Sequence, residues 1–238
     1  MTYELSLAIP IYNEEACVEQ VITELVEEFK ARGIALELIL VNNGSIDSSG
    51  EIIEKLRQKF PGTIKTIHLK KNAGIGGGVL AGMNAATGEF VGYTCSDGQI
   101  TPSDTFRLFR LVRNGDYHIG KTVRLVRNDG IWRKFLSGGF WFMATLMFWN
   151  RFDDINGYPV MLKRELFKKL KIKSKSYMLN LELLLKARKY HLNVGDVEAP
   201  FLERTGGRAH VNLYTPLRFF RELIELKKSG ILKEKLDL

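Results

Sequence analysis

The sequence predicts an α/β fold in which a mostly parallel, Rossmann-like sheet is flanked by helices on both faces. Buried-strand patterns alternate with amphipathic helix patterns through residues 1–100, as in chains whose strands are joined by crossover helices. Polar turns follow the strands, at the edge where parallel sheets bind their ligands. The hydrophobic content of 45% and the charged content of 26% are typical of a globular protein.

The first half contains four expected strands, at residues 5–12, 36–41, 64–69 and 89–96. Asn13 can cap the helix after the first strand, and the charge of Glu14 suits the amino end of that helix. Apolar residues at helical spacing continue this helix to Phe29, a second helix ends at Phe60, and a small-residue helix runs through Ala86. The turns after the strands are polar, so we expect them to form one site.

The second half of the chain is less regular. A helix is expected to begin near Pro102 and end at Asn114, followed by a strand within residues 117–127. A strongly apolar helix covers residues 176–190, and an amphipathic helix with a basic polar side begins at Pro216.

Residues 132–149 form an expected amphipathic helix that contains all three Trp of the chain and is bounded by basic residues. Two interpretations stay open, a core helix or a helix lying in a membrane interface, where Trp and basic flanks are usual. The apolar run at 135–149 is shorter than the roughly 20 residues that span a bilayer. No signal peptide is expected at the amino end.

The charge of the chain is unevenly distributed. Residues 1–100 carry a net charge of −5 and residues 101–238 carry +13, which gives the overall +8. The basic half suits an anionic partner such as phosphate or a lipid surface, whereas nucleic acid is disfavoured because no nucleic-acid-binding motif is present. Two cysteines, Cys17 and Cys95, are too few for a disulfide framework and favour a reducing compartment.

Two short motifs point toward chemistry. Asp97 stands at a strand end between Cys95 and Gln99, and it is either a metal ligand or an ordinary turn residue. The glycine-rich stretch 74–82 lacks the Lys-Ser/Thr of a P-loop and follows the third strand. It either packs closely on the sheet or helps to shape a nucleotide pocket.

The chain resembles family-2 glycosyltransferases of the GT-A fold, nearest the polyprenyl-phosphate type exemplified by dolichyl-phosphate mannose synthases. The resemblance runs from about Leu5 to Asn212 and rests on seven motifs in order. These are "IPIYNEE", "ILVNNGSID", "NAGIGGGVLAGMNAATGEF", "CSDGQITP", "DINGYPVMLKRE", "LNLELLLKA" and "ERTGGRAHVN".

The resemblance implies a binding site for a nucleoside-diphosphate sugar, UDP- or GDP-linked, and a divalent cation, Mn²⁺ or Mg²⁺. The expected nucleotide-binding residues are Pro10, Tyr12, Glu14, Asn43, Asn72, Gly74, Ser96 and Asp97. Asn42 and Asn43 stand where the family usually has two Asp, and Cys95 replaces the first Asp of the metal motif. Asp97 and Gln99 therefore remain as the expected metal ligands.

The resemblance also implies catalytic and acceptor residues. Asp97 and Arg204 are expected catalytic residues, and Glu182 joins them because an acidic residue on so apolar a helix is unusual. The expected acceptor and phosphate contacts are Arg124, Arg133, Asp154, Arg208 and His210. A lipid-phosphate acceptor needs no general base, whereas a saccharide hydroxyl needs a carboxylate, for which Glu182 and Asp154 are the candidates. Pro159 stands where the lipid-phosphate enzymes commonly carry Arg, so Arg124, Arg127, Arg133 or Lys134 would have to substitute for it.

We therefore expect an inverting glycosyltransferase that moves a sugar to a polyprenyl phosphate, peripherally bound at the cytoplasmic face of a membrane. A membrane-protein subunit is a further conceivable partner. A catalytic domain is expected at 1–212, with a nucleotide-binding half (1–100) and an acceptor half (101–212), followed by an amphipathic tail (213–238). Two alternatives remain: transfer to a saccharide hydroxyl in cell-surface polysaccharide assembly, or a degenerate domain that binds sugar nucleotide without turnover.

Overall fold

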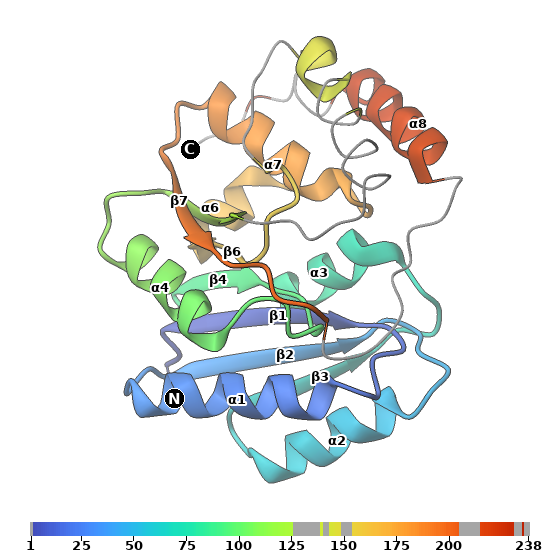
Figure 1. Ribbon diagram of the computed structural model, residues 1–238. Helices are drawn as coiled ribbons and strands as arrows, with labels where there is room; N and C mark the ends of the chain where they lie inside the picture. Colours follow the sequence, from blue (N-terminus) through green and yellow to red (C-terminus); the bar gives the residue numbers. More distant parts are fainter. Residues whose placement is uncertain are drawn as a thin grey trace.

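A single seven-stranded sheet runs through the protein in a computed structural model that describes residues 2–125, 139, 143–148, 154–204, 215–230 and 235 (Figure 1). The strands are β1 Leu5–Ile11, β2 Leu36–Asn42, β3 Ile64–His68, β4 Phe90–Tyr93, β5 Ile119–Arg124, β6 Val160–Lys163 and β7 Val194–Ala199. The helices are α1 Val18–Ala31, α2 Ser49–Lys59, α3 Gly74–Ala85, α4 Pro102–Arg113, α6 Arg164–Leu170, α7 Met178–Lys189 and α8 Thr215–Lys228.

The strand order is β3-β2-β1-β4-β6-β5-β7. Strands β1 to β4 are parallel to one another, β6 is antiparallel to β4 and β5, and β7 is parallel to β5. The prediction of a mostly parallel, Rossmann-like sheet is thus confirmed. The sheet draws strands from both expected halves, and the boundaries of 1–100, 101–212 and 213–238 stay predictions.

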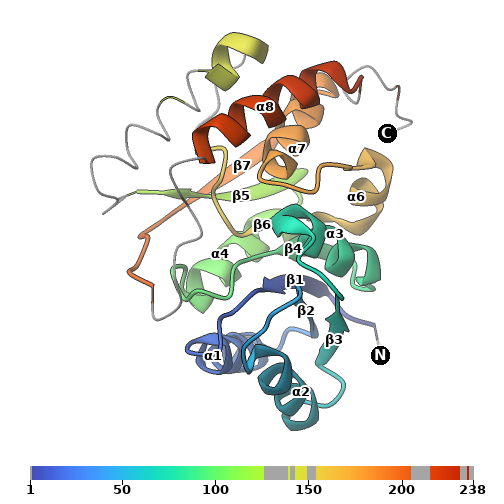
Figure 2. The ribbon, with the colours of Figure 1, turned by 90° about the vertical axis from the view of Figure 1, so that its right-hand side faces the viewer.

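Helices cover both faces of the sheet because the buried strands present apolar side chains to both sides (Figure 2). Alternate residues of β1 and β2, such as Leu7 and Leu38, pack against α1, α2 and α4. Their neighbours Ala8 and Ile39 pack against α3, α6 and α7. The α1–α4 contact includes an edge-to-face pair, with the ring centroids of Phe29 and Phe106 5.8 Å apart.

The glycines of α3 allow this helix to lie directly on the sheet. A Cβ atom at Gly82 would meet Cβ of Ala8 at 2.6 Å, and one at Gly78 would meet Cβ of Pro10 at 2.9 Å. These distances are too short for any larger residue without a shift of the helix. Close packing therefore accounts for the glycine-rich stretch, and it brings the amino end of α3 beside the carboxyl end of β1.

A third apolar cluster joins α7, α8 and residues 143–148. Leu223 and Leu226 of α8 are buried in it, while Arg218 and Arg221 pair with Glu222 and Glu225 on the polar side. The rest of the expected aromatic helix at 132–149, apart from Gly139, lies outside the described residues. Among those described, no helix is both long and apolar enough to cross a membrane.

The structure corrects the prediction that Glu182 is a catalytic carboxylate. Its side chain is 0% exposed and lies 2.7 Å from Nζ of Lys186, one helical turn further along α7. The carboxylate also accepts hydrogen bonds from the backbone N–H groups of Lys173 and Ser174, while Lys186 donates to the carbonyl of Leu170. Glu182 thus ties α7 to the segment that follows α6, and it has no access to a substrate.

We predict that Glu182→Gln lowers the free energy of unfolding by about 3–5 kcal/mol, because the Lys186 charge is left buried without its partner. Urea-induced unfolding of the wild type and the variant measures this difference in the free energy of unfolding. Glu225→Gln, in a pair of the same helical spacing that is solvent-exposed, is the control and should change little. Unchanged stability of Glu182→Gln would contradict the structural role.

Candidate active site

The polar turns after β1 and β2 form one hydrogen-bonded unit at the carboxyl edge of the sheet. The side chain of Asn13 accepts from the N–H of Ile46 at 2.9 Å, and Glu15 accepts from the N–H of Ser48 at 2.9 Å. In return, the hydroxyl of Ser49 accepts from the N–H of Glu14 at 2.9 Å. These contacts hold the buried Glu14 in the turn after β1, at the carboxyl edge of the sheet.

Asn43 connects this edge to the loop before α3. Its Oδ1 accepts from the N–H of Ala73 at 3.0 Å, and its Nδ2 donates to the carbonyl of Gly74 at 3.0 Å and to Oδ1 of Asn72 at 3.3 Å. Only an amide can both accept and donate in this way. Three expected nucleotide-binding residues, Asn43, Asn72 and Gly74, are therefore in mutual contact, and Gly74 adopts the positive φ of +77° that its turn requires.

Asn42 plays a separate local role. Its Oδ1 accepts from the N–H of Ser45 at 2.9 Å, and its Nδ2 lies 3.2 Å from Nδ1 of His68. The two amides that replace the usual carboxylates thus both stabilise turns.

Asp97 and Glu14 meet at a shared arginine. The guanidinium of Arg204 lies 3.2 Å from Oδ2 of Asp97 and 3.8 Å from Oε1 of Glu14. Asp97 is 8% exposed, and burial raises its pKa, although Arg204 and the N–H of Gln99 act in the opposite direction. The structure brings together the three expected residues that carry charge at this edge.

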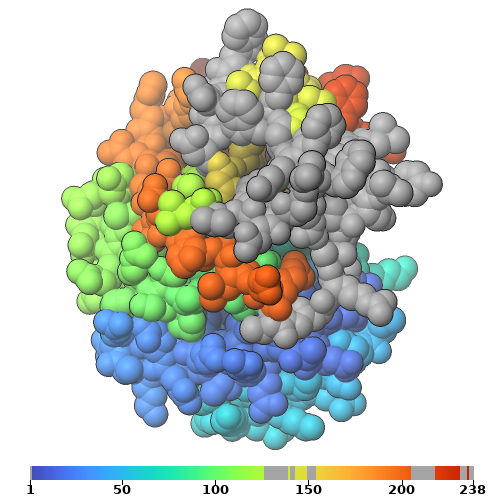
Figure 3. Space-filling view, viewed as in Figure 1, coloured from blue at the N-terminus to red at the C-terminus, as the bar shows by residue number. Residues whose placement is uncertain are grey.

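The segment that carries Arg204 is held across the site. It follows β7, lies on the surface above the N-terminal part of the molecule (orange in Figure 3), and pairs with the turn that contains Asp97. Leu202 donates its N–H to the carbonyl of Gln99 at 2.9 Å, and Nε2 of Gln99 donates to the carbonyl of Leu202 at 3.1 Å. Gln99 therefore positions Arg204, besides its expected role as a metal ligand.

The two cysteines stand beside these charges. Burial, as the larger cause, and the nearby Glu14 carboxylate raise the pKa of Cys17 to about 12. The Cys17 thiol lies 3.3 Å from the carbonyl of Ser96. Burial, as the larger cause, and the nearby Asp97 carboxylate also raise the pKa of Cys95. Both side chains are neutral thiols at neutral pH, and a neutral thiol is a poor ligand for a hard cation.

Arg124 and Asp154 form a second charged pair beside the site. Nε of Arg124 lies 2.8 Å from Oδ2 of Asp154, and the same oxygen accepts from the backbone N–H of Arg124 at 3.1 Å. The guanidinium also lies 5.0 Å from the centre of the Phe201 ring. The Asp154 carboxylate is thus engaged by Arg124, and its role at the acceptor stays a prediction.

The remaining expected residues are placed less closely. Pro10 packs against α3 at Gly78. Tyr12 directly follows β1 and is half-buried. Arg133, Arg208 and His210 lie outside the described residues, as do Arg127 and Lys134. Sequence reasoning missed the hydrogen bond of 2.7 Å between the side chains of Tyr93 and Asn180, because the two residues are far apart in the sequence.

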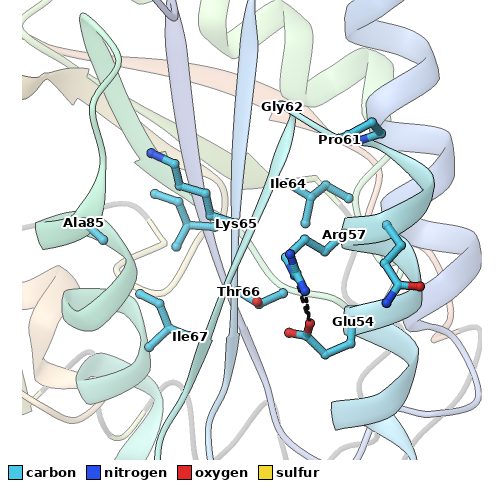
Figure 4. Close-up of a pocket in the computed structure, with 11 residues that line it drawn as sticks. Glu54, Arg57, Pro61, Gly62, Ile64, Lys65, Thr66, Ile67 and Ala85 are labelled. Atoms are coloured by element: carbon cyan, nitrogen blue, oxygen red, sulfur yellow. Dashed lines mark hydrogen bonds and ion pairs between the residues drawn. The ribbon is translucent and has the colours of Figure 1, made fainter.

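A surface hollow of about 650 Å³ lies elsewhere, between α2 and the edge strand β3 (Figure 4). Ile64, Lys65 and Thr66 line it, and Glu54 at its rim is already paired with Arg57. None of the expected site residues contributes to it. We therefore assign the candidate site to the carboxyl edge of β1, β2 and β4.

The chain matches a known protein family. The sequence profile described as Glycosyl transferase family 2 matches residues 6–175. The chain belongs to glycosyltransferase family 2. The region it matches contains the turns after β1 and β2, the loop before α3 and the Asp97 turn.

Curated relatives match part of the chain. It is 29% identical over 133 residues to the undecaprenyl-phosphate 4-deoxy-4-formamido-L-arabinose transferase of Pseudomonas aeruginosa (strain LESB58), covering 56% of this chain and 39% of the relative. The enzyme of the same name from Yersinia pestis bv. Antiqua (strain Angola) is 32% identical over 134 residues, covering 56% and 41%. The chain thus spans about two-fifths of the length of these relatives.

Solved structures share the fold. Glucosyl-3-phosphoglycerate synthase from Mycobacterium tuberculosis, in complex with phosphoglyceric acid, superposes with a TM-score of 0.72 at 18% identity, covering 95% of this chain and 79% of that one. The same synthase with Mn²⁺, UDP and glucosyl-3-phosphoglycerate gives a TM-score of 0.68 at 18% identity, covering 95% and 80%. The GT-A fold expected from the motifs is confirmed.

We predict that Asn43→Asp, although it restores the residue usual in the family, lowers the free energy of unfolding by about 1–3 kcal/mol. Asn43 is 3% exposed, and a carboxylate there would face the oxygens of Gly74 and Asn72 without a proton to donate. Asn42→Asp is the matched control, because that half-buried position lets His68 donate to the new carboxylate. Thermal unfolding of both variants tests this, and equal stability would contradict it.

Proposed function

We propose that this chain is an inverting glycosyltransferase that moves a sugar from a nucleoside-diphosphate sugar to a polyprenyl phosphate at the cytoplasmic face of a membrane. The observation that carries the proposal is the Arg204 guanidinium between Asp97 and Glu14, at the edge where β1 and β4 end. The names of the relatives, which are undecaprenyl-phosphate transferases, support the acceptor, and structural neighbours crystallised with UDP support the donor.

The leaving group sets the first chemical requirement. When the bond from the anomeric carbon to the diphosphate breaks, its electron pair leaves with the diphosphate, whose added negative charge must be stabilised. Arg204 uses part of its guanidinium on Asp97 and has further N–H groups to donate to phosphate oxygens. Gln99 holds Arg204 in place through Leu202.

A divalent cation fits the donor chemistry of this edge. The Asp97 carboxylate and the Gln99 amide supply hard oxygen ligands, which Mg²⁺ and Mn²⁺ prefer. Within the described ranges no group of three or more His, Cys, Asp or Glu could hold a metal alone, so the nucleotide diphosphate would complete the ligand set. When bound, the cation would neutralise charge on the diphosphate.

The carboxylates favour a phosphate acceptor over a saccharide hydroxyl. A hydroxyl needs a general base, but Glu182 is buried against Lys186 and Asp154 is bound to Arg124. An acceptor phosphate is already an anion, and one of its oxygens can form the new bond to the anomeric carbon on the face opposite the leaving diphosphate. We propose Arg124, which is paired with Asp154, as a contact for that phosphate.

We predict that the protein binds UDP or GDP more tightly with Mn²⁺ than with EDTA, as measured by titration calorimetry. Arg204→Gln should weaken this binding by about 10- to 100-fold, because a charge-assisted hydrogen bond to phosphate is lost. Arg107→Gln is the control, since Arg107 pairs with Asp104 at 2.7 Å on α4. Transfer of sugar to undecaprenyl phosphate in detergent, compared with an alkyl saccharide, then tests the acceptor.

Failure to bind either nucleotide would overturn the donor site and favour the degenerate-domain alternative. Nucleotide binding that does not depend on metal would support the nucleotide pocket and exclude the cation from the proposed mechanism. Transfer to the alkyl saccharide alone would overturn the phosphate acceptor. Cys95→Asp adds a further readout, because a second carboxylate should strengthen Mn²⁺ dependence if Asp97 contacts the cation.

A further inference from the structure

Residues 163–175 concentrate the positive charge of the chain. They include six Lys and one Arg against a single acidic residue, Glu165, so their net charge is +6, compared with +8 for the whole protein. Glu165 pairs with Lys168 at 3.0 Å within α6. The next acidic residue in the chain is Glu182, which is buried in α7. None of these basic residues takes part in the proposed transfer reaction.

Residues 171–175, called the lysine strap from here on, join α6 to α7 next to α3 (Figure 2). Exposed and half-buried side chains alternate along it. Lys171, Lys173 and Lys175 are exposed, whereas Ile172 and Ser174 between them are half-buried. This alternation is the period of an extended chain, in which every second side chain points the same way, at intervals of about 6.6 Å. The three lysines therefore form a row on the surface.

The backbone of the lysine strap is fixed from the inside by the buried ion pair of α7. The N–H groups of Lys173 and Ser174 donate to the carboxylate of Glu182 at 3.1 and 2.8 Å. Nζ of Lys186 donates to the carbonyl of Lys171 at 3.0 Å. The buried pair thus holds the row in place through main-chain groups of the strap.

The far end of the lysine strap lies beside the candidate site. The carbonyl of Lys175 accepts from the N–H of Gly77 in α3 at 3.0 Å, and it would lie 2.7 Å from a Cβ atom at Gly74. The carbonyl of Gly74 accepts in turn from Asn43, in the turn after β2. The row of lysines therefore borders the loop before α3, which is part of the edge where the nucleotide is proposed to bind.

The composition of the row favours a membrane surface as its partner. Like charges held side by side repel one another, and an anion lying against them removes this repulsion. Lysine is a hydrated point charge on a flexible stem, which suits a diffuse negative surface, whereas arginine suits the bidentate binding of a single phosphate. No aromatic residue stands among the strap lysines to stack on nucleic-acid bases. Basic clusters of this size bind anionic phospholipid headgroups.

We infer that the lysine strap, together with the neighbouring Lys169 of α6, docks the protein on a membrane surface of anionic phospholipids. The inference deepens the proposed function, on which it rests for an acceptor that resides in the membrane, and it names the surface that faces the lipid. Docking there brings the loop before α3, and with it the carboxyl edge of the sheet, close to the headgroups. The buried pair of Glu182 and Lys186 supports this surface by holding its backbone.

Flotation with vesicles of equal parts phosphatidylglycerol and phosphatidylcholine, at low salt, tests the inference. The triple variant Lys171→Gln/Lys173→Gln/Lys175→Gln keeps the main-chain hydrogen bonds of the strap, so the fold should survive. Its affinity for these vesicles should fall roughly 100-fold, because each lysine near an anionic surface contributes about fivefold. High salt should release the wild type, and vesicles of phosphatidylcholine alone should bind neither protein.

The matched control removes the same charge on the opposite face of the sheet. Lys30 of α1 and Lys55 and Lys59 of α2 are exposed there. Lys30→Gln/Lys55→Gln/Lys59→Gln should therefore lose little affinity for the vesicles. An equal loss in both triple variants would show that only the net charge matters, and it would overturn the inference. Binding of the wild type to single-stranded RNA but not to the vesicles would overturn it as well.

Two further measurements keep the outcomes separate. The strap variant should bind UDP and GDP in calorimetry as the wild type does. If the wild type binds neither nucleotide, the proposed function fails, while the vesicle experiment still decides the docking surface. Should the strap variant not fold, chemical acetylation of the wild type decides. The vesicles should protect Lys171, Lys173 and Lys175 but leave Lys55 and Lys59 reactive, and equal reactivity of both sets would overturn the inference.

Discussion

A carboxylate removed from water must be matched by cations or hydrogen-bond donors, and this constraint organises the protein. Glu37 is buried and would be hard to ionise, yet Lys65, Ser6 and Thr87 hold its pKa below the usual range. Glu182 lies beside the Lys186 ammonium and accepts hydrogen bonds from two backbone N–H groups. At Asp97, burial raises the pKa, although Arg204 and the N–H of Gln99 act in the opposite direction. The contacts of Glu37 and Glu182 join parts of the fold, whereas those of Asp97 lie at the candidate site.

The same comparison explains how the edge tolerates three departures from the family pattern. Asn42 and Asn43 stabilise turns through hydrogen bonds that need an amide, so the lost carboxylates are replaced by local structure. Cys95 is a neutral thiol, which removes one negative charge next to Asp97. With fewer carboxylates at the edge, the single guanidinium of Arg204 faces two of them, Asp97 and Glu14. Arg204 thus lies between the two buried carboxylates of this edge.

Much of this could be predicted from the sequence, because strand and helix periodicities and polar turns depend on local patterns. They predicted correctly that strands alternate with helices in the first half and that the polar turns after the strands share one edge of the sheet, whereas Arg204 was added from the resemblance to the family. The partners of individual side chains could not be predicted in this way. Glu182 looked like a functional acid on an apolar helix, although Lys186 four residues later already suggested an internal pair. The hydrogen bond between Asn180 and Tyr93 could not be predicted, because the two residues are distant in the sequence.

The charge balance also bears on which acceptor the site can serve. An enzyme that activates a hydroxyl needs a carboxylate whose oxygens are accessible and basic. Here the Asp154 carboxylate accepts hydrogen bonds from both the side chain and the backbone of Arg124, so its oxygens are already engaged. Under the proposed function, the acceptor would meet a cation paired with a carboxylate at Arg124 and Asp154. A nucleophile that arrives already charged, such as a phosphate, is the one that this arrangement can position without first removing a proton.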